Sequence, residues 1–195
     1  WVQTWDHLYA VNKQTGVEFD DPIHRLYLLN KDASKIVYIA EYNNQNTYRT
    51  RNNAWPGNDR ENGTIYSNHK NINTVRHSIY SFLNGDYEKS YSYWDENAEV
   101  NDINLSEPIT LSDAKKANEE LMKNFTFDAA DEVGYPDYLE YDLWESKDVL
   151  SWWKFRMTRK SDGKKIVLPI HYIHGFDNEG KIINVTMYFN ASLMQ

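Results

Sequence analysis

The chain has no cysteine in its 195 residues. This absence excludes disulfide bonds and thiol catalysis, but it does not identify the compartment, because reduced and oxidising compartments both hold proteins without disulfides. The chain also lacks any apolar run near the roughly 20 residues that a membrane-spanning helix needs. We therefore expect a soluble protein, whether cytoplasmic, periplasmic or secreted.

Positive charge is also scarce. The 21 Lys and Arg residues are outnumbered by 29 Asp and Glu residues, which gives a formal net charge of -8. Nucleic acids and anionic membrane surfaces bind to basic protein faces. The charge balance therefore predicts that neither a nucleic acid nor a membrane is a partner.

The most informative feature that is present is an internal repeat. Residues 2–44 resemble residues 149–191 at a nearly constant offset. Identical pairs at this offset include Trp5 and Trp152, Gly16 and Gly163, Pro22 and Pro169, Ile23 and Ile170, and His24 and His171. After one extra residue in a turn of the first copy, Tyr42 aligns with Tyr188. The repeat predicts two related domains, of which the first is represented only by its second half.

Three segments of the chain differ in their pattern. Residues 1–45 contain three strand-like runs separated by polar turns. Residues 46–70 are rich in Asn, Arg and Gly and have no apolar period, so we predict a linker or a long loop. Residues 71–195 begin with helical periodicity and continue with strand-like runs, which predicts one complete domain.

Three helices are predicted in this complete domain. An apolar stripe from Val75 to Leu83 indicates the first helix, and Asp86 can cap the second. Thr110 and Ser112 are alternative caps for the third. The strand-like runs span residues 98–103, 125–131, 138–145, 150–159, 166–176 and 182–189. Helices followed by a long antiparallel sheet are typical of the α+β class.

Two segments of this domain resemble the NTF2-like superfamily, which includes SnoaL-like and ketosteroid-isomerase-like proteins. They are FLNGDYEKSYSYWDENAEVND at residues 82–102 and FDNEGKIINVTMYF at residues 176–189. The resemblance implies a cone, in which N-terminal helices pack on a curved mixed or antiparallel sheet and a pocket opens at one end. It also implies that members pair through the outer faces of their sheets. Through the repeat, residues 1–45 correspond to the last three strands of the same fold.

Two explanations of the incomplete first copy are open. In one, a helical half precedes Trp1 in a longer chain, since three strands alone leave an apolar face exposed to water. In the other, residues 1–45 have lost their helices and pack against the complete domain. In either case the half-domain can take the position of a second subunit. We therefore expect an intramolecular pseudo-dimer or a homodimer through sheet faces.

Alternation along residues 149–157 predicts the two faces of one strand. Trp153 and its alternate neighbours are mostly apolar, which indicates the interior of the cone. Trp152 alternates with Lys154 on the outer face, and the repeat gives Trp5 the equivalent position. Exposed rings of this kind are either interface anchors or partly covered surface residues.

The resemblance also implies a candidate base inside the cone. A gapless match of residues 84–102 to ketosteroid isomerases aligns Asp102 with their general base. An apolar pocket raises the pKa of a carboxyl group, so that it can take and return a proton near neutral pH. Where those isomerases carry an oxyanion-binding Tyr and a protonated Asp, this chain has Ser78 and Tyr172. Because serine is too short to replace a phenol, we do not expect steroid isomerisation.

His174 follows Tyr172 by two residues in a predicted strand and therefore shares its inward face. Asp102, Tyr172 and His174 together suggest acid and base chemistry on a carbonyl compound, as in SnoaL-like cyclases or dehydratases. The alternative is structural: Asp102 ends a strand and caps a turn, and His174 is a hydrogen-bonded strand residue. His171 faces the opposite way from His174, so the pair does not suggest a metal site, and we expect no metal and no cofactor.

Aromatic residues make up 15% of the chain and allow two interpretations. They either wall a pocket for a small apolar molecule or fill the cone completely. The residues concerned are Trp94, Phe125, Trp153, Tyr172, Phe176 and Phe189. We accordingly predict a protein that binds a small hydrophobic organic molecule and that, as an enzyme, would be a cofactor-independent isomerase, cyclase or dehydratase. The alternative is a non-catalytic structural or interaction domain that uses its outer sheet face.

Overall fold

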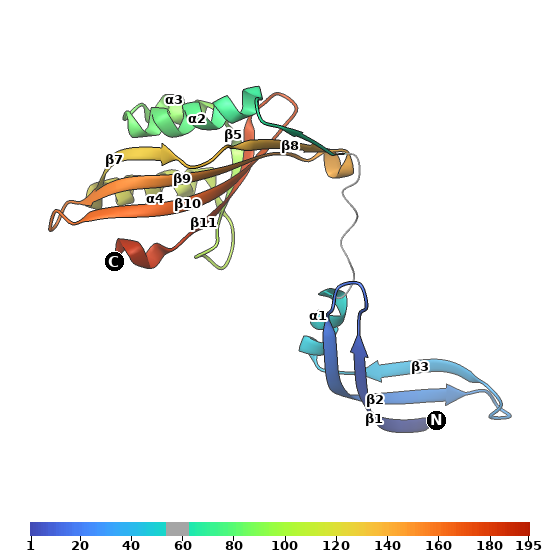
Figure 1. Ribbon diagram of the computed structural model, residues 1–195. Helices are drawn as coiled ribbons and strands as arrows, with labels where there is room; N and C mark the ends of the chain where they lie inside the picture. The colour runs from blue at the N-terminus through green and yellow to red at the C-terminus, as the bar shows by residue number, and fades with distance from the viewer. Residues whose placement is uncertain (54–62) are drawn as a thin grey trace. The chain divides into compact units, whose positions relative to one another are not determined.

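The chain folds into two compact units, which Figure 1 draws from a computed structural model. The structure describes residues 1–53 and 63–195. Unit 1 comprises Trp1–Asp59 and unit 2 comprises Arg60–Gln195, so the division falls within the segment 46–70. Among the described residues, no helix combines the length and the apolar character that crossing a membrane requires.

Unit 1 is a three-stranded antiparallel meander followed by a helix. Its elements are β1 (Val2–Val11), β2 (Glu18–Leu29), β3 (Ile36–Tyr42) and α1 (Gln45–Asn53). β2 is the central strand, so Trp5 stands opposite His24 and His24 stands opposite Tyr42. The turn between β1 and β2 places Gly16 at φ 72°, a left-handed conformation that glycine adopts without a side-chain clash. The predicted strands thus form, with the three rings on one face.

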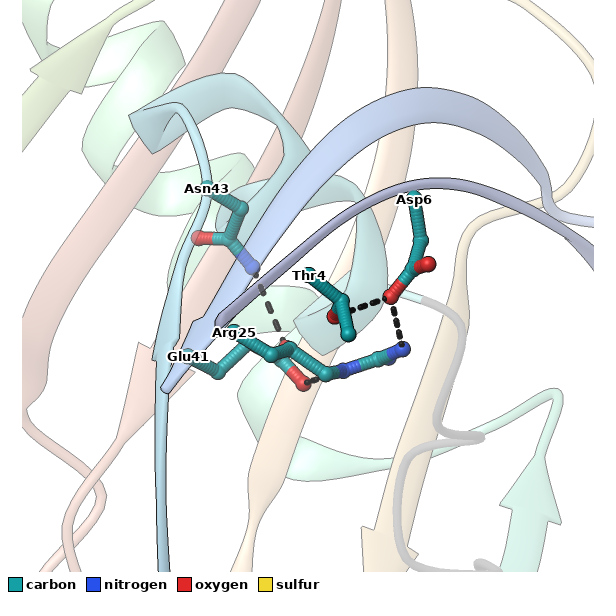
Figure 2. Close-up of polar contacts among 5 residues, drawn as sticks. All are labelled: Thr4, Asp6, Arg25, Glu41 and Asn43. Atoms are coloured by element: carbon teal, nitrogen blue, oxygen red, sulfur yellow. Dashed lines mark hydrogen bonds and ion pairs between the residues drawn. The ribbon is translucent and has the colours of Figure 1, made fainter. Parts of the chain in front are cut away.

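The other face of this meander carries an ion-pair network (Figure 2). The guanidinium group of Arg25 lies 3.6 Å from the carboxylate of Asp6 and 3.3 Å from that of Glu41. Thr4 donates a hydrogen bond to Asp6 at 2.6 Å, and Asn43 donates one to Glu41 at 3.4 Å. In the strand register Arg25 is opposite both Thr4 and Glu41. The face opposite to the three rings is therefore charged at its centre. This is the face that helices would cover in a complete domain.

Unit 2 combines helices with an eight-stranded mixed sheet. In its described part the α-helices are α2 (Lys70–Leu83), α3 (Tyr87–Ser92) and α4 (Leu111–Asn124), and the short 3-10 helices are η1 (Leu143–Glu145) and η2 (Ala191–Met194). The strands are β4 (Gly63–Tyr66), β5 (Trp94–Asp102), β6 (Ile109–Thr110), β7 (Phe125–Glu132), β8 (Asp137–Tyr141), β9 (Lys147–Arg159), β10 (Lys165–Phe176) and β11 (Ile182–Phe189). Their order is β4-β8-β9-β10-β11-β5-β6, with β7 paired to β9, and only the β5–β11 pair is parallel. The predicted α+β class is confirmed.

Regular structure extends into the segment 46–70, where the sequence analysis predicts none. Helix α1 overlaps its start and β4 lies near its end, while residues 54–62 fall outside the described part of the chain. The α1 sequence QNTYRTRNN has no apolar period, and β4 has four residues at the edge of the sheet. Neither element therefore produces a periodic signal. The predicted strand 138–145 is also too long, because Trp144 has a left-handed φ of 57° that a strand cannot contain.

Helix starts in unit 2 follow the predicted capping signals. The Asp86 carboxylate accepts a hydrogen bond from the backbone N–H of Lys89 at 3.2 Å, at the start of α3. The Thr110 hydroxyl accepts one from the backbone N–H of Asp113 at 3.2 Å, so Thr110, and not Ser112, caps α4. These side chains satisfy N–H groups that have no partner within a helix.

Replacing Thr110 with alanine should lower the free energy of unfolding by about 1 kcal/mol, because the first turn of α4 loses its acceptor. Urea unfolding followed by circular dichroism measures the change. Thr110→Ser keeps the hydroxyl oxygen and serves as the matched control. If both variants lose the same stability, the threonine methyl group and not the cap is the stabilising feature.

Strand β9 separates the core from the outer surface. The predicted inward residues are all buried: Val149, Trp153, Phe155 and Met157. Trp152, by contrast, is 37% exposed, and Lys154 and Arg156 are exposed on the same face. The two faces predicted from alternation along this strand are confirmed.

Candidate functional site

A cavity of about 400 Å³ lies inside unit 2, between its helices and the inner face of its sheet. Aliphatic and aromatic side chains make up most of its wall, including Phe82, Phe127 and Phe155. The polar lining residues are Ser78, Ser90, Tyr91, Asp102, Asn118, Tyr172 and His174. Leu105, which also lines the cavity, is 48% exposed, so the cavity reaches the surface beside the loop after β5. This size and lining are typical of sites for small molecules.

His174 brings a buried imidazole ring to the cavity wall. Its side chain is 3% exposed, and among the described residues its Nδ1 atom has no hydrogen-bond partner. The ring centroid lies 6.0 Å from that of Trp94 and 5.2 Å from that of Tyr172. Burial, with a smaller effect of His171, lowers the pKa of His174 to about 3. The ring is therefore neutral at pH 7 and offers one donor and one acceptor nitrogen.

Asp102 and Tyr172 stand in one row across three strands. Met187 of β11 is opposite Asp102 of β5 on one side and opposite Tyr172 of β10 on the other. Adjacent strands are about 4.8 Å apart, so roughly 10 Å separates the two backbones, a span that a small ligand can bridge. Burial raises the pKa of the Tyr172 hydroxyl, and the negative charge of Asp102 raises it further. Tyr172 therefore remains protonated and can donate a hydrogen bond into the cavity.

The Asp102 carboxylate also has a local structural role. Its Oδ1 atom accepts hydrogen bonds from the backbone N–H and the side-chain amide of Asn104, both at 2.8 Å. This is the turn-capping arrangement that the sequence analysis left as an alternative. Within the described part of the chain, Oδ2 has no hydrogen-bond partner. One carboxylate oxygen thus holds the turn, and the other has no partner among the described residues, in a side chain that lines the cavity.

The Ser78 hydroxyl forms hydrogen bonds to other groups of the protein. It therefore cannot bind a ligand oxyanion as the phenol of a tyrosine would. Its hydroxyl accepts a hydrogen bond from the indole N–H of Trp94 at 3.0 Å and donates one to the carbonyl oxygen of Ser90 at 3.2 Å. Ser90 in turn donates to the Ser78 carbonyl at 2.7 Å. These bonds join α2, α3 and β5, which orients Trp94 along the wall. They agree with the expectation that Ser78 does not replace a catalytic phenol.

Only part of the predicted aromatic wall lines the cavity. Trp94, Tyr172 and Phe189 line it, as expected. The other three residues belong to buried clusters and are not among the lining residues: Phe125, Trp153 and Phe176. They face inward as alternation predicts, but other side chains cover them. Their places in the wall are taken by rings such as Phe82 and Phe127.

Sequence reasoning missed one polar pair in the wall. The side-chain amide of Asn118 on α4 donates a hydrogen bond to the hydroxyl of Tyr91 on α3 at 3.1 Å. The sequence contained a signal for it, because Asn118 lies at helical spacing between Ala114 and Leu121 on an otherwise apolar stripe. A polar residue inside such a stripe indicates a buried hydrogen bond or a site.

The outer sheet faces of both units carry a row of stacked rings. In unit 1 the His24 ring lies 4.8 Å from Trp5 and 5.6 Å from Tyr42, between centroids. In unit 2 the corresponding stack comprises Trp152, His171 and Tyr188, with centroid distances of 4.8 and 5.7 Å. His171 therefore lies on the face opposite to His174. In the regions described by the structure, no cluster of three or more His, Asp or Glu residues is arranged to hold a metal ion.

Comparison with known proteins identifies the fold. No protein-family model and no curated protein match the sequence. Among solved structures, a candidate isomerase from Bacillus subtilis is similar at 13% identity and a TM-score of 0.50, over 63% of this chain and 91% of that chain. A candidate polyketide cyclase from Xanthomonas campestris is similar at 13% identity and a TM-score of 0.49, over 65% of this chain and 95% of that chain. An NTF2-like protein of unknown function from Burkholderia pseudomallei is similar at 17% identity and a TM-score of 0.44, again over 65% of this chain and 95% of that chain. At such identities the likeness establishes the fold alone. The predicted cone-shaped NTF2-like fold is confirmed.

Proposed function

We propose that unit 2, which has the NTF2-like fold, binds a small, neutral and largely apolar organic molecule in its cavity. The observation that carries the proposal is an apolar cavity of about 400 Å³ whose wall includes the polar side chains of Tyr172 and His174. A ligand that forms a hydrogen bond to such a group in an apolar cavity gains about 0.5–1.5 kcal/mol from it.

The charge of the site supports a neutral ligand. His174 is uncharged at neutral pH because burial lowers its pKa to about 3. Asp102 is close enough to Tyr172 for its negative charge to raise the pKa of the phenol. A ligand carboxylate or sulfonate in the same space would be repelled by Asp102. A ketone or hydroxyl group instead fits the hydroxyl donor of Tyr172 beside the neutral imidazole of His174.

The neutral fluorescent ketone prodan is a suitable probe, because it is flat, apolar and has a carbonyl oxygen. We expect saturable binding with a blue-shifted emission, and weaker binding of the anionic dye 1-anilinonaphthalene-8-sulfonate. Ala114→Phe, at a buried residue that lines the cavity, should abolish prodan binding if the variant remains folded by circular dichroism. Ile109→Trp is a second blocking variant. Retained binding in two folded, blocked variants would place the dye elsewhere and refute the proposal.

Replacing Tyr172 with phenylalanine should weaken prodan binding about two- to tenfold, because one hydrogen bond to the carbonyl contributes about 0.5–1.5 kcal/mol. Fluorescence titration measures the dissociation constant. Tyr138→Phe is the matched control, since Tyr138 is buried in unit 2 but does not line the cavity. An equal loss in the two variants would contradict a direct role of Tyr172.

The row of Asp102 and Tyr172 favours a second, catalytic candidate function. A carboxylate of Asp102 would remove a proton from the carbon next to a ketone, the electron pair would move to the carbonyl oxygen, and Tyr172 would stabilise the enolate. Prodan has such protons, and their exchange in deuterium oxide is measurable by NMR. Asp102→Asn keeps an oxygen for the Asn104 turn but removes the base. It should slow protein-dependent exchange by about 10²-fold while prodan still binds. Unchanged exchange in this variant would exclude the base.

A further inference from the structure

The polar groups of the cavity wall lie on two different sides of unit 2. Asp102, Tyr172 and His174 belong to the sheet, in strands β5 and β10. Tyr91 and Asn118 belong to the helices, in α3 and α4. The ketone of the proposed ligand contacts only the sheet side. A second polar group of the same ligand can therefore meet the helix side.

The pair of Tyr91 and Asn118 leaves a donor and an acceptor unused. The side-chain amide of Asn118 donates a hydrogen bond to the Tyr91 hydroxyl oxygen at 3.1 Å. Among the described residues, the Tyr91 hydroxyl proton has no acceptor, and the Oδ1 atom of Asn118 has no donor. A ligand hydroxyl can accept from Tyr91 and donate to Asn118 at the same time.

The two serines of the helix side are already bonded within the protein. The Ser78 hydroxyl donates to the carbonyl oxygen of Ser90 at 3.2 Å, and the Ser90 hydroxyl donates to that of Ser78 at 2.7 Å. The Ser78 hydroxyl oxygen also accepts from the indole N–H of Trp94 at 3.0 Å. In the described part of the helix side, Tyr91 and Asn118 are thus the polar lining residues with free hydrogen-bonding capacity.

Two contacts hold the Tyr91 ring in place. Its ring centroid lies 6.5 Å from that of Phe82 in an edge-to-face arrangement, and the ammonium group of Lys115 lies 4.7 Å from the same centroid. Burial raises the pKa of the Tyr91 hydroxyl, although the hydrogen bond from Asn118 acts in the opposite direction. The phenol therefore stays protonated at neutral pH, and a donor already held in position loses little freedom on binding.

A row of aromatic rings connects the two polar sides. From Tyr91 it continues through Phe82, Phe127 and Phe155 to Tyr172, and all five residues line the cavity. Neighbouring ring centroids are between 5.8 and 6.5 Å apart, and neighbouring planes are close to perpendicular. A ligand that lies along this row meets hydrocarbon in its middle and hydrogen-bonding groups at its ends.

Helix α4 indicates how far apart the two polar sides are. Ala114 belongs to the buried cluster against which Tyr172 packs. Asn118 follows Ala114 by about one helical turn and so lies roughly 6 Å further along the same side of α4. A separation of this order suits a compact ligand with one or two rings.

We propose that Tyr91 and Asn118 form a helix-side subsite for a ligand hydroxyl, so that the cavity selects a hydroxyketone over the corresponding simple ketone. This inference rests on the proposed binding of a neutral molecule. The ketone oxygen meets Tyr172, the apolar body lies along the row of rings, and the hydroxyl bonds to Tyr91 and Asn118. A ligand without the hydroxyl leaves both groups unpaired in a largely apolar wall, which is the physical basis of the selection.

Two analogues of prodan test the helix-side subsite. One carries a hydroxyl group in place of the dimethylamino group, and the other carries a hydrogen atom there. Isothermal titration calorimetry of the full chain gives both dissociation constants, at a pH that keeps the naphthol neutral. The hydroxyl analogue should bind about tenfold more tightly, as expected for two hydrogen bonds of ordinary strength. Tyr91→Phe and Asn118→Leu should each reduce this preference to about threefold, and the double variant should abolish it.

Tyr87→Phe is the matched control for the loss of a phenol. Tyr87 also lies on α3 and packs on Phe82, but it does not line the cavity, so this variant should keep the full preference. If the bond between Tyr91 and Asn118 only joins the two helices, its loss weakens both ligands equally and leaves their ratio unchanged. Circular dichroism verifies that each variant is folded, and Asn118→Ala replaces Asn118→Leu if the leucine variant does not fold.

The outcomes separate the subsite from the binding function on which it rests. Equal affinity of the wild-type protein for the two analogues would overturn the helix-side subsite, and so would a preference that persists in the folded double variant. Either result leaves the binding of a ketone in place. If prodan and both analogues fail to bind, the proposed binding function is refuted and the subsite with it.

Discussion

Replacing Trp153 with alanine should lower the free energy of unfolding of unit 2 by about 3–5 kcal/mol, the range for loss of a buried Trp or Phe side chain. Trp153 is 1% exposed and packs in the cluster that contains Phe155 and Leu168. The variant loses the transfer free energy of the indole and leaves a void that the rigid sheet only partly closes. Urea unfolding of the full chain, followed by circular dichroism, measures the change.

Two controls isolate the effect of the buried ring. Trp152→Ala changes the adjacent residue of β9 on the exposed face, so its cost should be well below that of Trp153→Ala. Trp153→Phe keeps a ring and removes an indole N–H that has no partner among the described residues, which offsets part of the lost contact. Similar costs for the two alanine variants would contradict the assignment of the faces.

Acid should destabilise unit 2 through His174. Its pKa is about 3 in the folded chain, against 6.5 when unperturbed. Between these values the unfolded state binds a proton that the folded state does not, so stability falls as the pH falls from 6.5 toward 3. The limiting slope is about 1.4 kcal/mol per pH unit, and the total is on the order of 5 kcal/mol. Above pH 6.5 the group contributes no pH dependence.

His174→Leu identifies this contribution, because leucine has no proton to bind. Urea unfolding free energies of both proteins between pH 7 and 4 give two curves whose difference removes the shared effect of the carboxylates. The wild-type curve should fall more steeply, and the curves should converge or cross in acid. Parallel curves would show that folding does not lower the pKa of His174.

The sequence predicts the faces of the strands better than it predicts the cavity. Alternation gives the correct inward side for Trp153 and Phe176, since side chains of a strand point to opposite faces by geometry. It does not give the position along the cone at which helices cover that side. Residues of α2 pack against both rings: Phe176 lies in a cluster with Ile72 and Val75, and the Tyr80 ring lies 5.8 Å from that of Trp153, so neither lines the cavity. Where helices and sheet separate depends on tertiary packing.

The start of a helix or strand is also predictable only where its signal is local in the sequence. Capping signals at Asp86 and Thr110 are local, and both hold. Helix α2 begins at Lys70, before its apolar stripe, because the side chain of His69 accepts a hydrogen bond from the backbone N–H of Asn71. Histidine is not among the residues that usually signal a helix start. Strand β4 depends on its partner β8, so its own four residues carry little information.

The ion-pair network of unit 1 makes its meander chemically different from the similar meander β9-β10-β11 of unit 2. At the offset of the repeat, Arg25 corresponds to Tyr172 and Asp6 to Trp153. If helices covered this face, Arg25 and the carboxylates of Asp6 and Glu41 would be desolvated. Desolvation costs several kcal/mol for each ion. A hydrocarbon ligand has no group that replaces this hydration. This face of unit 1 therefore stays hydrated or meets polar groups, whereas the equivalent face of unit 2 borders an apolar cavity.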